Sequence, residues 1–175
     1  MNKLLCAVTK PRPADSLAAL TLREARPDDI ENLLTCFGPD SVWRRDADFW
    51  SGVLAMQNRW LLVAELDGRI VGHGSLLTLA DRTELHDLAV APDARGLGLG
   101  RALATELEAE ARRRGLQHLH LKVGLYADYG PAQRLYISLG YQMDGRGLLQ
   151  GDDQVKPGQT VLVDDELLLG MVKSL

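Results

Sequence analysis

Residues 84–115 read ELHDLAVAPDARGLGLGRALATELEAEARRRG, and this stretch decides the fold of the chain. The apolar run Leu85–Val90 predicts a strand, and the last part predicts an amphipathic helix that ends before Gly115. Between them lies a glycine-rich turn, Arg95–Arg101, which we call the glycine arc. The start of a helix offers free backbone N–H groups, and glycines let an anion approach them closely. The stretch therefore predicts a pyrophosphate site.

The spacing of the glycines indicates which of the known classes of phosphate-binding site the sequence can match. The dinucleotide-binding fingerprint G-x-G-x-x-G does not fit, because Arg101 fills the third glycine position. A P-loop does not fit either, because no Lys-Ser or Lys-Thr follows the glycines. The spacing that remains is Arg, two residues, Gly, one residue and Gly, at Arg95, Gly98 and Gly100.

A second motif lies closer to the C-terminus, where residues 132–141 read AQRLYISLGY. Pro131 is expected to open a short helix here, and Gly140 is expected to end it. Tyr136 stands inside this helix. Taken alone, its ring would pack in the core with its hydroxyl at the rim.

Together the two motifs resemble those of the GNAT acetyltransferase superfamily, over about Thr21 to Leu175. The resemblance implies a mixed, mostly antiparallel central sheet flanked by helices, with acetyl-coenzyme A as cosubstrate and no metal. Tyr129 stands where that family often has asparagine, so contact with the cofactor or with the substrate stays open there. The cofactor contacts implied are Leu88, Ala89, Val90, Arg95, Gly96, Leu97, Gly98, Leu99, Gly100, Arg101, Tyr129, Ala132, Leu135 and Tyr136.

The resemblance also implies catalytic roles. Acetyl transfer to an amine needs the neutral amine, and a lysine-like amine with a pKa of about 10.4 is almost entirely protonated at pH 7. Glu84 matches a position where several family members place the base, and His86, about 7 Å along the strand, is the alternative. The family commonly uses the tyrosine at the position of Tyr136 as general acid. A backbone N–H near Val90 is implied as the oxyanion donor.

The rest of the chain predicts an α/β fold with a mixed, largely antiparallel sheet, because strands and helices alternate with hairpins. Residues 1–20 are expected to form an N-terminal extension, and residues 21–175 a single acetyltransferase domain. Asp67-Gly68 is a strong hairpin signal between two strands. Further strands are expected at Thr21–Ala25, Trp60–Leu66, Arg69–Leu77, Leu116–Val123, Tyr141–Asp144 and Val161–Met171, helices at Pro27–Phe37 and 46–57, and a loop at Gly145–Gln159.

The composition fits this interpretation. With 175 residues, 46% of them hydrophobic and 25% charged, the chain suits one globular domain. Its net charge of −4 argues against nucleic acid as a partner. No apolar run approaches the ~20 residues of a membrane span. The two cysteines lack disulfide or metal spacing, so we expect a cytoplasmic protein.

Two functions from different classes follow. The first is an N-acetyltransferase that acts on a small amine or on an exposed amino group of a peptide or protein. The second is a non-enzymatic acyl-coenzyme-A-binding module, such as a sensor. Tyr136 and Glu84 beside the glycine arc favour the enzyme. The family often forms homodimers, but no residue pattern here fixes the oligomeric state.

Overall fold

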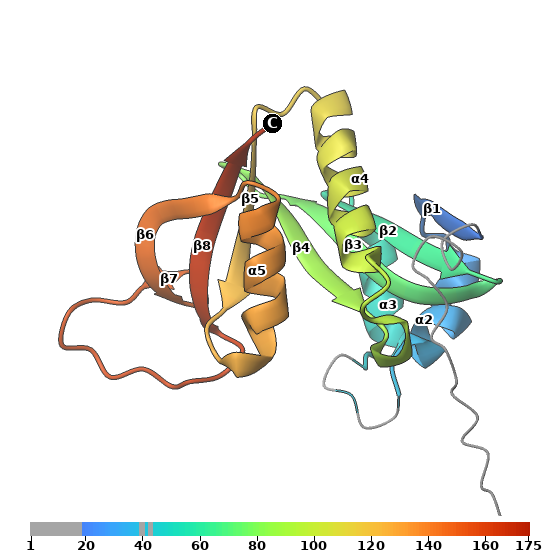
Figure 1. Cartoon of the computed structure of the whole chain (residues 1–175), viewed down its shortest axis with the longest axis horizontal. Coiled ribbons are helices and arrows are strands. Elements are labelled where there is room, and N and C mark those ends of the chain that lie inside the picture. The colour runs from blue at the N-terminus through green and yellow to red at the C-terminus, as the bar shows by residue number, and fades with distance from the viewer. Residues whose placement is uncertain (1–18, 39–40, 42–43) are drawn as a thin grey trace, which may run out of the picture.

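The computed structural model describes residues 19–38, 41 and 44–175, so nearly all of the predicted N-terminal extension lies outside the described residues. The described part contains one eight-stranded sheet with the order β1-β2-β3-β4-β5-β8-β6-β7 (Figure 1). All neighbouring strands are antiparallel except β4 and β5. The fold class predicted from the sequence is confirmed. The strands are β1 (Leu20–Glu24), β2 (Arg59–Leu66), β3 (Arg69–Thr78), β4 (Thr83–Val90), β5 (His118–Gly124), β6 (Gln142–Gln150), β7 (Asp153–Gln154) and β8 (Leu167–Ser174).

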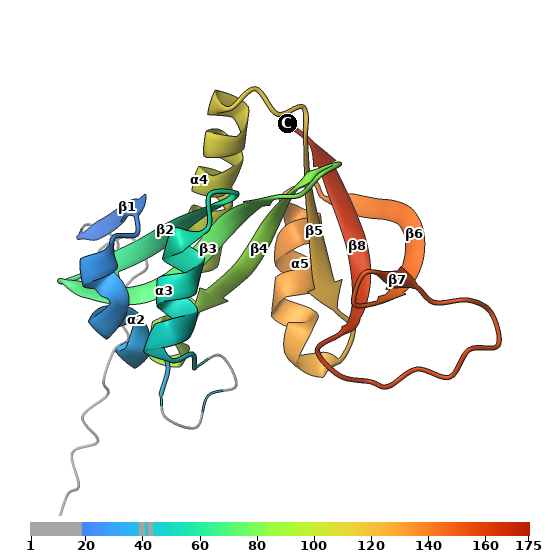
Figure 2. The ribbon, with the colours of Figure 1, turned by 180° about the vertical axis from the view of Figure 1, so that it is seen from behind.

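Helices cover both faces of the sheet. Helices α4 and α5 lie on one face, and α2 and α3 on the other (Figures 1 and 2). A Cβ added at Gly74 of β3 would lie 2.9 Å from Leu107 of α4, so this glycine lets α4 pack closely. The helices are α2 (Ile30–Cys36), α3 (Ala47–Ala55), α4 (Leu99–Arg113) and α5 (Gly130–Ser138), with 3₁₀ turns η1 (Pro27–Asp29), η2 (Pro92–Ala94) and η3 (Ala127–Tyr129).

The parallel strands β4 and β5 diverge. They share a single paired position, Glu84 with His120, and separate towards their C-terminal ends (Figure 1). A β-bulge in β4 accompanies this divergence: Ser75 pairs with His86 but His73 pairs with Ala89, so Gly74 faces two residues of β4. Within the bulge Asp87 has a φ of 49°. Because a bulge bends its strand, the end of β4 is directed away from β5 and towards the glycine arc.

The prediction of a loop at Gly145–Gln159 and a strand from Val161 was wrong in part. Strand β6 continues to Gln150, and β8 begins only at Leu167. Gly145 and Gly147 have φ values of 85° and 77°, and the pairing register shifts between Met143 and Leu148. The glycines therefore form a bulge within the strand instead of ending it, since glycine adopts positive φ without a steric cost.

His73 is buried on the α2/α3 face of β3. Its side chain is 3% exposed, and neither ring nitrogen has a hydrogen-bond partner among the described residues. The ring lies edge-on to Phe37 and Trp50, with centroids 5.6 and 5.0 Å away. Burial disfavours the charged imidazolium and lowers the pKa of His73 to about 4. His73 is thus a neutral core residue at pH 7.

This burial makes the stability of the protein depend on pH. Between about pH 6.5 and 4 the unfolded chain binds the proton of His73 more tightly than the folded protein does, so stability falls as the pH falls. From pH 7 to pH 5 this residue should account for about 2 kcal/mol. In His73→Phe, the free energy of unfolding measured in urea should fall less between pH 7 and pH 5 than it does in wild type. The difference should be the contribution given above for His73. The exposed His118 serves as control through His118→Gln, and equal losses in wild type and His73→Phe would contradict the assignment.

Candidate active site

The glycine arc leaves backbone donors free at the start of α4. Gly98 is the N-cap of this helix, with a φ of 85°, and no side chain caps it. The first helical hydrogen bond runs from the Ala102 N–H to the Gly98 carbonyl, over 3.0 Å. The N–H groups of the three residues between them therefore have no partner within the helix. Because Gly96 and Gly98 are exposed, an anion could reach these donors.

Three segments meet at the arc. A Cβ added at Gly100 would lie 3.5 Å from Leu135 of α5 and 3.9 Å from both Leu88 and Val90 of β4. Arg101 joins the same helices, since its Nη2 donates to the Ser138 hydroxyl over 2.6 Å. The structure thus brings together the predicted cofactor-contacting residues of the strand end, the arc and the second motif.

Arg95 is exposed at the side of the arc. Its Nε donates to the carbonyl of Val90 over 3.2 Å, so the guanidinium lies over the end of β4. A guanidinium has further donors beyond the one used here. Arg95 can therefore turn towards an anion on the arc by giving up a single exposed hydrogen bond.

Tyr136 of α5 is almost fully buried, with 6% of its surface exposed. Its ring lies edge-on to that of Tyr141, with centroids 5.7 Å apart. No hydrogen bond of its hydroxyl contributes to its environment within the described part of the chain, where burial alone acts on it. Burial raises the pKa of Tyr136, so the hydroxyl stays protonated at neutral pH. A protonated, unengaged hydroxyl is what a general acid requires.

Tyr129 points elsewhere. Its ring covers the backbone of Gly124 at the end of β5, where an added Cβ would collide with the ring. Its hydroxyl donates to Asp165, in the segment before β8, over 2.9 Å. Tyr126 donates to the same carboxylate. Tyr129 therefore holds the end of β5 against the segment before β8. Among the predicted cofactor-contacting residues, it is the one whose side chain hydrogen-bonds to that segment.

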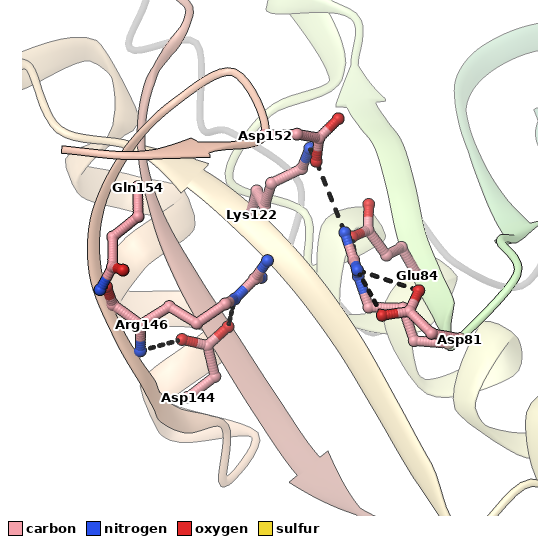
Figure 3. Close-up of polar contacts among 8 residues, drawn as sticks. Asp81, Glu84, Lys122, Asp144, Arg146, Asp152 and Gln154 are labelled. Carbon is pink, nitrogen blue, oxygen red and sulfur yellow. Dashed lines mark hydrogen bonds and ion pairs between the residues drawn. The ribbon is translucent and has the colours of Figure 1, made fainter.

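Glu84 lies where β4 and β5 still pair. Its side chain is 2% exposed, and one oxygen accepts a hydrogen bond from Arg82 Nε over 2.7 Å. Figure 3 shows Glu84 beside Asp81, with Asp152 and Lys122 facing them. Arg82 also contacts Asp81 at 3.0 Å and Asp152 at 3.5 Å. A carboxylate held in this way has little access to a substrate amine.

Two depressions adjoin these ion pairs. One, of about 330 Å³, is lined by the β3–β4 turn and the start of β5, and the other, of about 200 Å³, extends it towards β6. Both are lined by Asp81, Arg82 and His120, and the smaller also by Asp144 and Arg146. Neither is lined by the glycine arc, His86 or Tyr136. These depressions lie on the narrow side of the diverging strands.

His86 differs from Glu84 in access and in partners. Its side chain is 34% exposed, and Nδ1 lies 3.3 Å from Asp87 Oδ2. The same carboxylate oxygen accepts a hydrogen bond of 2.5 Å from Arg59 Nη2. Burial alone would raise the pKa of Asp87, but the contacts with His86 and Arg59 outweigh it and hold that pKa well below its usual range. Asp87 is therefore a carboxylate beside the imidazole.

The sequence analysis missed Arg59 and Asp87. Arg59 begins β2, 28 residues before Asp87, and the two meet only because β2, β3 and β4 are neighbours in the sheet. The bulge that turns Asp87 towards His86 has a positive φ at a residue other than glycine. No local spacing rule predicts such a bulge, so neither residue carried a signal in the sequence.

The class of protein follows from two features. One is a mostly antiparallel sheet with a single diverging parallel pair, and the other is a helix start with free backbone donors after the first of these two strands. The family model for the acetyltransferase (GNAT) family matches residues 23–141, which is more than half of the chain. The protein belongs to the GNAT family of acetyltransferases.

Relatives agree with this assignment. An uncharacterised N-acetyltransferase of Azospirillum brasilense is 40% identical over 82 residues, which are 43% of this chain and 49% of that protein. A protein of Bacillus subtilis (strain 168), provisionally assigned as a ribosomal protein bS18-alanine N-acetyltransferase, is 30% identical over 131 residues, 71% of this chain and 82% of its own. The chain thus spans about half the length of the first relative and most of the second.

A solved structure gives the same result. The ribosomal-protein-alanine N-acetyltransferase from Brucella melitensis has a TM-score of 0.67 and 27% sequence identity, over 89% of this chain and 99% of that one. Among the described residues of the present chain, no helix is long and apolar enough to cross a membrane. Within the same residues, no group of three or more His, Cys, Asp or Glu side chains is placed to hold a metal ion.

Proposed function

We propose that the protein transfers an acetyl group from acetyl-coenzyme A to a primary amine, either a small molecule or an exposed amino group of a peptide or protein. The observation that carries this proposal is the exposed start of α4, where free N–H groups and two positive-φ glycines can hold a pyrophosphate. Family membership supports the reaction, and the names of two relatives support a protein amine as acceptor.

Different residues of the chain provide the base, the general acid and the oxyanion donor of this reaction. Bound acetyl-coenzyme A supplies an activated acetyl group as a thioester. A base on β4 accepts the proton of the acceptor ammonium, which leaves the amine lone pair free to attack. Tyr136 donates its hydroxyl proton to the departing sulfur, whose parent thiol has a pKa of about 8.5. The backbone N–H of Val90 is the proposed donor to the oxyanion.

His86 is better placed than Glu84 to be the base. Glu84 is buried and accepts a hydrogen bond from Arg82, so it would have to break an ion pair before it could accept a proton. His86 is one-third exposed and keeps Nε2 outside the contacts made by its Nδ1. It also stands next to the bulge, two residues nearer to the arc than Glu84. We therefore assign the base to His86.

Release of free coenzyme A tests the function. Purified protein and acetyl-coenzyme A would be incubated with small primary amines, with peptides that have a free N-terminus, and with the same peptides blocked at the N-terminus. Release that depends on the amine is the expected result, and the blocked peptides separate an N-terminal acceptor from a lysine side chain. If acetyl-coenzyme A raises the Tm but no amine accelerates release, the protein is a binding module instead.

Removal of Arg95 should weaken cofactor binding. Charge-assisted hydrogen bonds from a guanidinium to phosphate are worth about 1.5–3 kcal/mol, so Arg95→Ala should raise the KM for acetyl-coenzyme A by about ten- to a hundred-fold. The effect should shrink at high salt. Arg69→Ala is the matched control, because it removes an exposed arginine that is paired with Asp93. An unchanged KM in Arg95→Ala would show that Arg95 is an ordinary turn residue.

A further inference from the structure

Arg59 is a buried arginine that links three neighbouring strands at the bulge of β4. Its side chain is only 7% exposed. Nε donates to the hydroxyl of Ser75 on β3 over 3.0 Å, and Nη2 donates to Asp87 on β4 over 2.5 Å. The Ser75 hydroxyl in turn donates to the carbonyl of His86 over 3.1 Å. Arg59 therefore fixes the backbone of His86 and the carboxylate of Asp87 together.

The bulge gives this network its unusual geometry. Successive residues of a regular strand point to opposite faces, so the side chains of His86 and Asp87 would normally be separated by the sheet. With φ at 49°, Asp87 instead lies with His86 on the face that Arg59 occupies. The carboxylate reaches the Nδ1 side of the preceding imidazole, at 3.3 Å.

The contacts decide which ring nitrogen carries the proton. If Nδ1 were unprotonated, its lone pair would face the Asp87 oxygen at 3.3 Å, and the two would repel. If Nδ1 carries the proton, the carboxylate gains a second donor beside Arg59. Arg59 Nη2 also lies 3.4 Å from Nδ1 and could donate only to an unprotonated Nδ1, but this contact is longer than the one between Nδ1 and the carboxylate, and Nη2 already donates to Asp87 at 2.5 Å. The arrangement therefore favours the Nδ1–H tautomer, with the lone pair on Nε2.

We propose that Arg59 is a positioning residue which, by holding Asp87 against the imidazole, keeps His86 as the Nδ1–H tautomer with Nε2 free to accept the proton of the acceptor amine. The tautomer stands on geometry alone, whereas the proton transfer rests on the proposed function. In that step Nε2 takes one proton from the ammonium, and the imidazolium formed is balanced by the Asp87 carboxylate. The proton then passes to water.

A spectroscopic measurement tests the tautomer without any assay of activity. Ring-labelled histidine would be incorporated, and the His86 signals among the four histidines would be assigned with His86→Gln. At a pH where the imidazole is neutral, the ring nitrogen and carbon shifts distinguish the two tautomers. Wild type should show Nδ1–H. A wild-type His86 in the Nε2–H form would overturn the proposal.

Two variants of Asp87 sharpen the result. Asp87→Gly keeps the bulge, because glycine accepts the positive φ, and removes the acceptor, so His86 should shift to the Nε2–H form that Arg59 can then bind. Asp87→Asn should retain the Nδ1–H form, because its amide oxygen faces the Arg59 donor and can still accept from Nδ1. An unchanged tautomer in Asp87→Gly would overturn the role of the carboxylate.

Kinetics test the positioning role. Arg59→Met and Asp87→Gly should each lower kcat about ten- to a hundred-fold and leave the KM for acetyl-coenzyme A nearly unchanged. Arg59→Met alone removes the arginine partner of the half-buried Asp87 carboxylate and is expected to lower the Tm, so the double variant Arg59→Met/Asp87→Gly is needed as well. The double variant should regain the wild-type Tm but not the wild-type kcat. Arg113→Ala, which breaks an exposed arginine pair on α4, should leave both unchanged.

The outcomes are separable. Recovery of kcat in the double variant would show that Arg59 and Asp87 only stabilise the bulge, and would overturn the proposal. Normal kcat in every variant, with the tautomer as expected, would remove His86 as the base and overturn the catalytic part. If no amine is acetylated by wild type, the proposed function fails, and the tautomer measurement, made also on the double variant and on Arg59→Met, still decides whether Arg59 and Asp87 position His86.

Discussion

Gly98→Asp is expected to abolish the stabilisation of the protein by acetyl-coenzyme A while the protein itself stays folded. A Cβ added at Gly98 meets no atom within 4 Å, and aspartate tolerates a φ of 85° better than most residues. Its carboxylate would add both bulk and negative charge beside the free N–H groups of α4. The same donors and the same space would then be closed to a phosphate.

The measurement is the shift in Tm with acetyl-coenzyme A. At a ligand concentration of about 100 times Kd, wild type should gain about 2.7 kcal/mol, which is several degrees. Gly98→Asn is the matched control, because asparagine has the same size and tolerates the same backbone without adding charge. It should keep a smaller but measurable shift. Equal shifts in wild type and Gly98→Asp would show that the pyrophosphate does not bind at the arc.

Local patterns were enough to predict the framework of this site. The apolar run Leu85–Val90 and the helical periodicity after it predicted β4 and α4, because those signals depend only on neighbouring residues. Asp67-Gly68 predicted the β2–β3 hairpin, and the two residues have φ values of 51° and 77°, as a type I′ turn requires. Helix α4 is amphipathic as predicted, and its apolar face places Leu99, Leu103 and Leu107 in the core.

The parts that could not be predicted depend on contacts between distant segments. Glu84 was a candidate base from its position in the chain, but its burial and its bond to Arg82 appear only when β4 pairs with β5. No glycine in β4 marks the bulge at Asp87 in the sequence. Arg59, which pairs with Asp87, belongs to another strand, β2. In β6 the opposite error arose, because glycines that suggested a loop form a bulge in a continuous strand.

These two bulges show why a prediction from residue type alone was wrong about where the strands are interrupted. A positive φ is easiest at glycine, so a sequence reader expects a break at Gly145 and none at Asp87. The bulge in β6 is tolerated because β8 pairs with the strand on both sides of it. At Asp87 the buried bond to Arg59 can offset the cost of a positive φ. Tertiary contacts therefore decided both cases.

Tyr136→Phe is expected to lower kcat about a hundred-fold or more while the Kd for acetyl-coenzyme A hardly changes. The substitution removes one hydroxyl and keeps the ring that packs against Tyr141 at 5.7 Å. Among the described residues burial alone acts on that hydroxyl, with no hydrogen bond, so no group is left unpaired by its loss. Folding stability should therefore be nearly unchanged.

Tyr141→Phe makes the same chemical change at the neighbouring buried ring, whose hydroxyl is also without a partner among the described residues, and should retain wild-type kcat. Because burial raises the pKa of Tyr136, its deprotonation should cause no loss of wild-type kcat below about pH 10. The rate of the chemical step would be measured in a single turnover, so that product release does not mask the loss. If Tyr136→Phe keeps more than about half of wild-type kcat under those conditions, water or the substrate supplies the proton and Tyr136 only fills space.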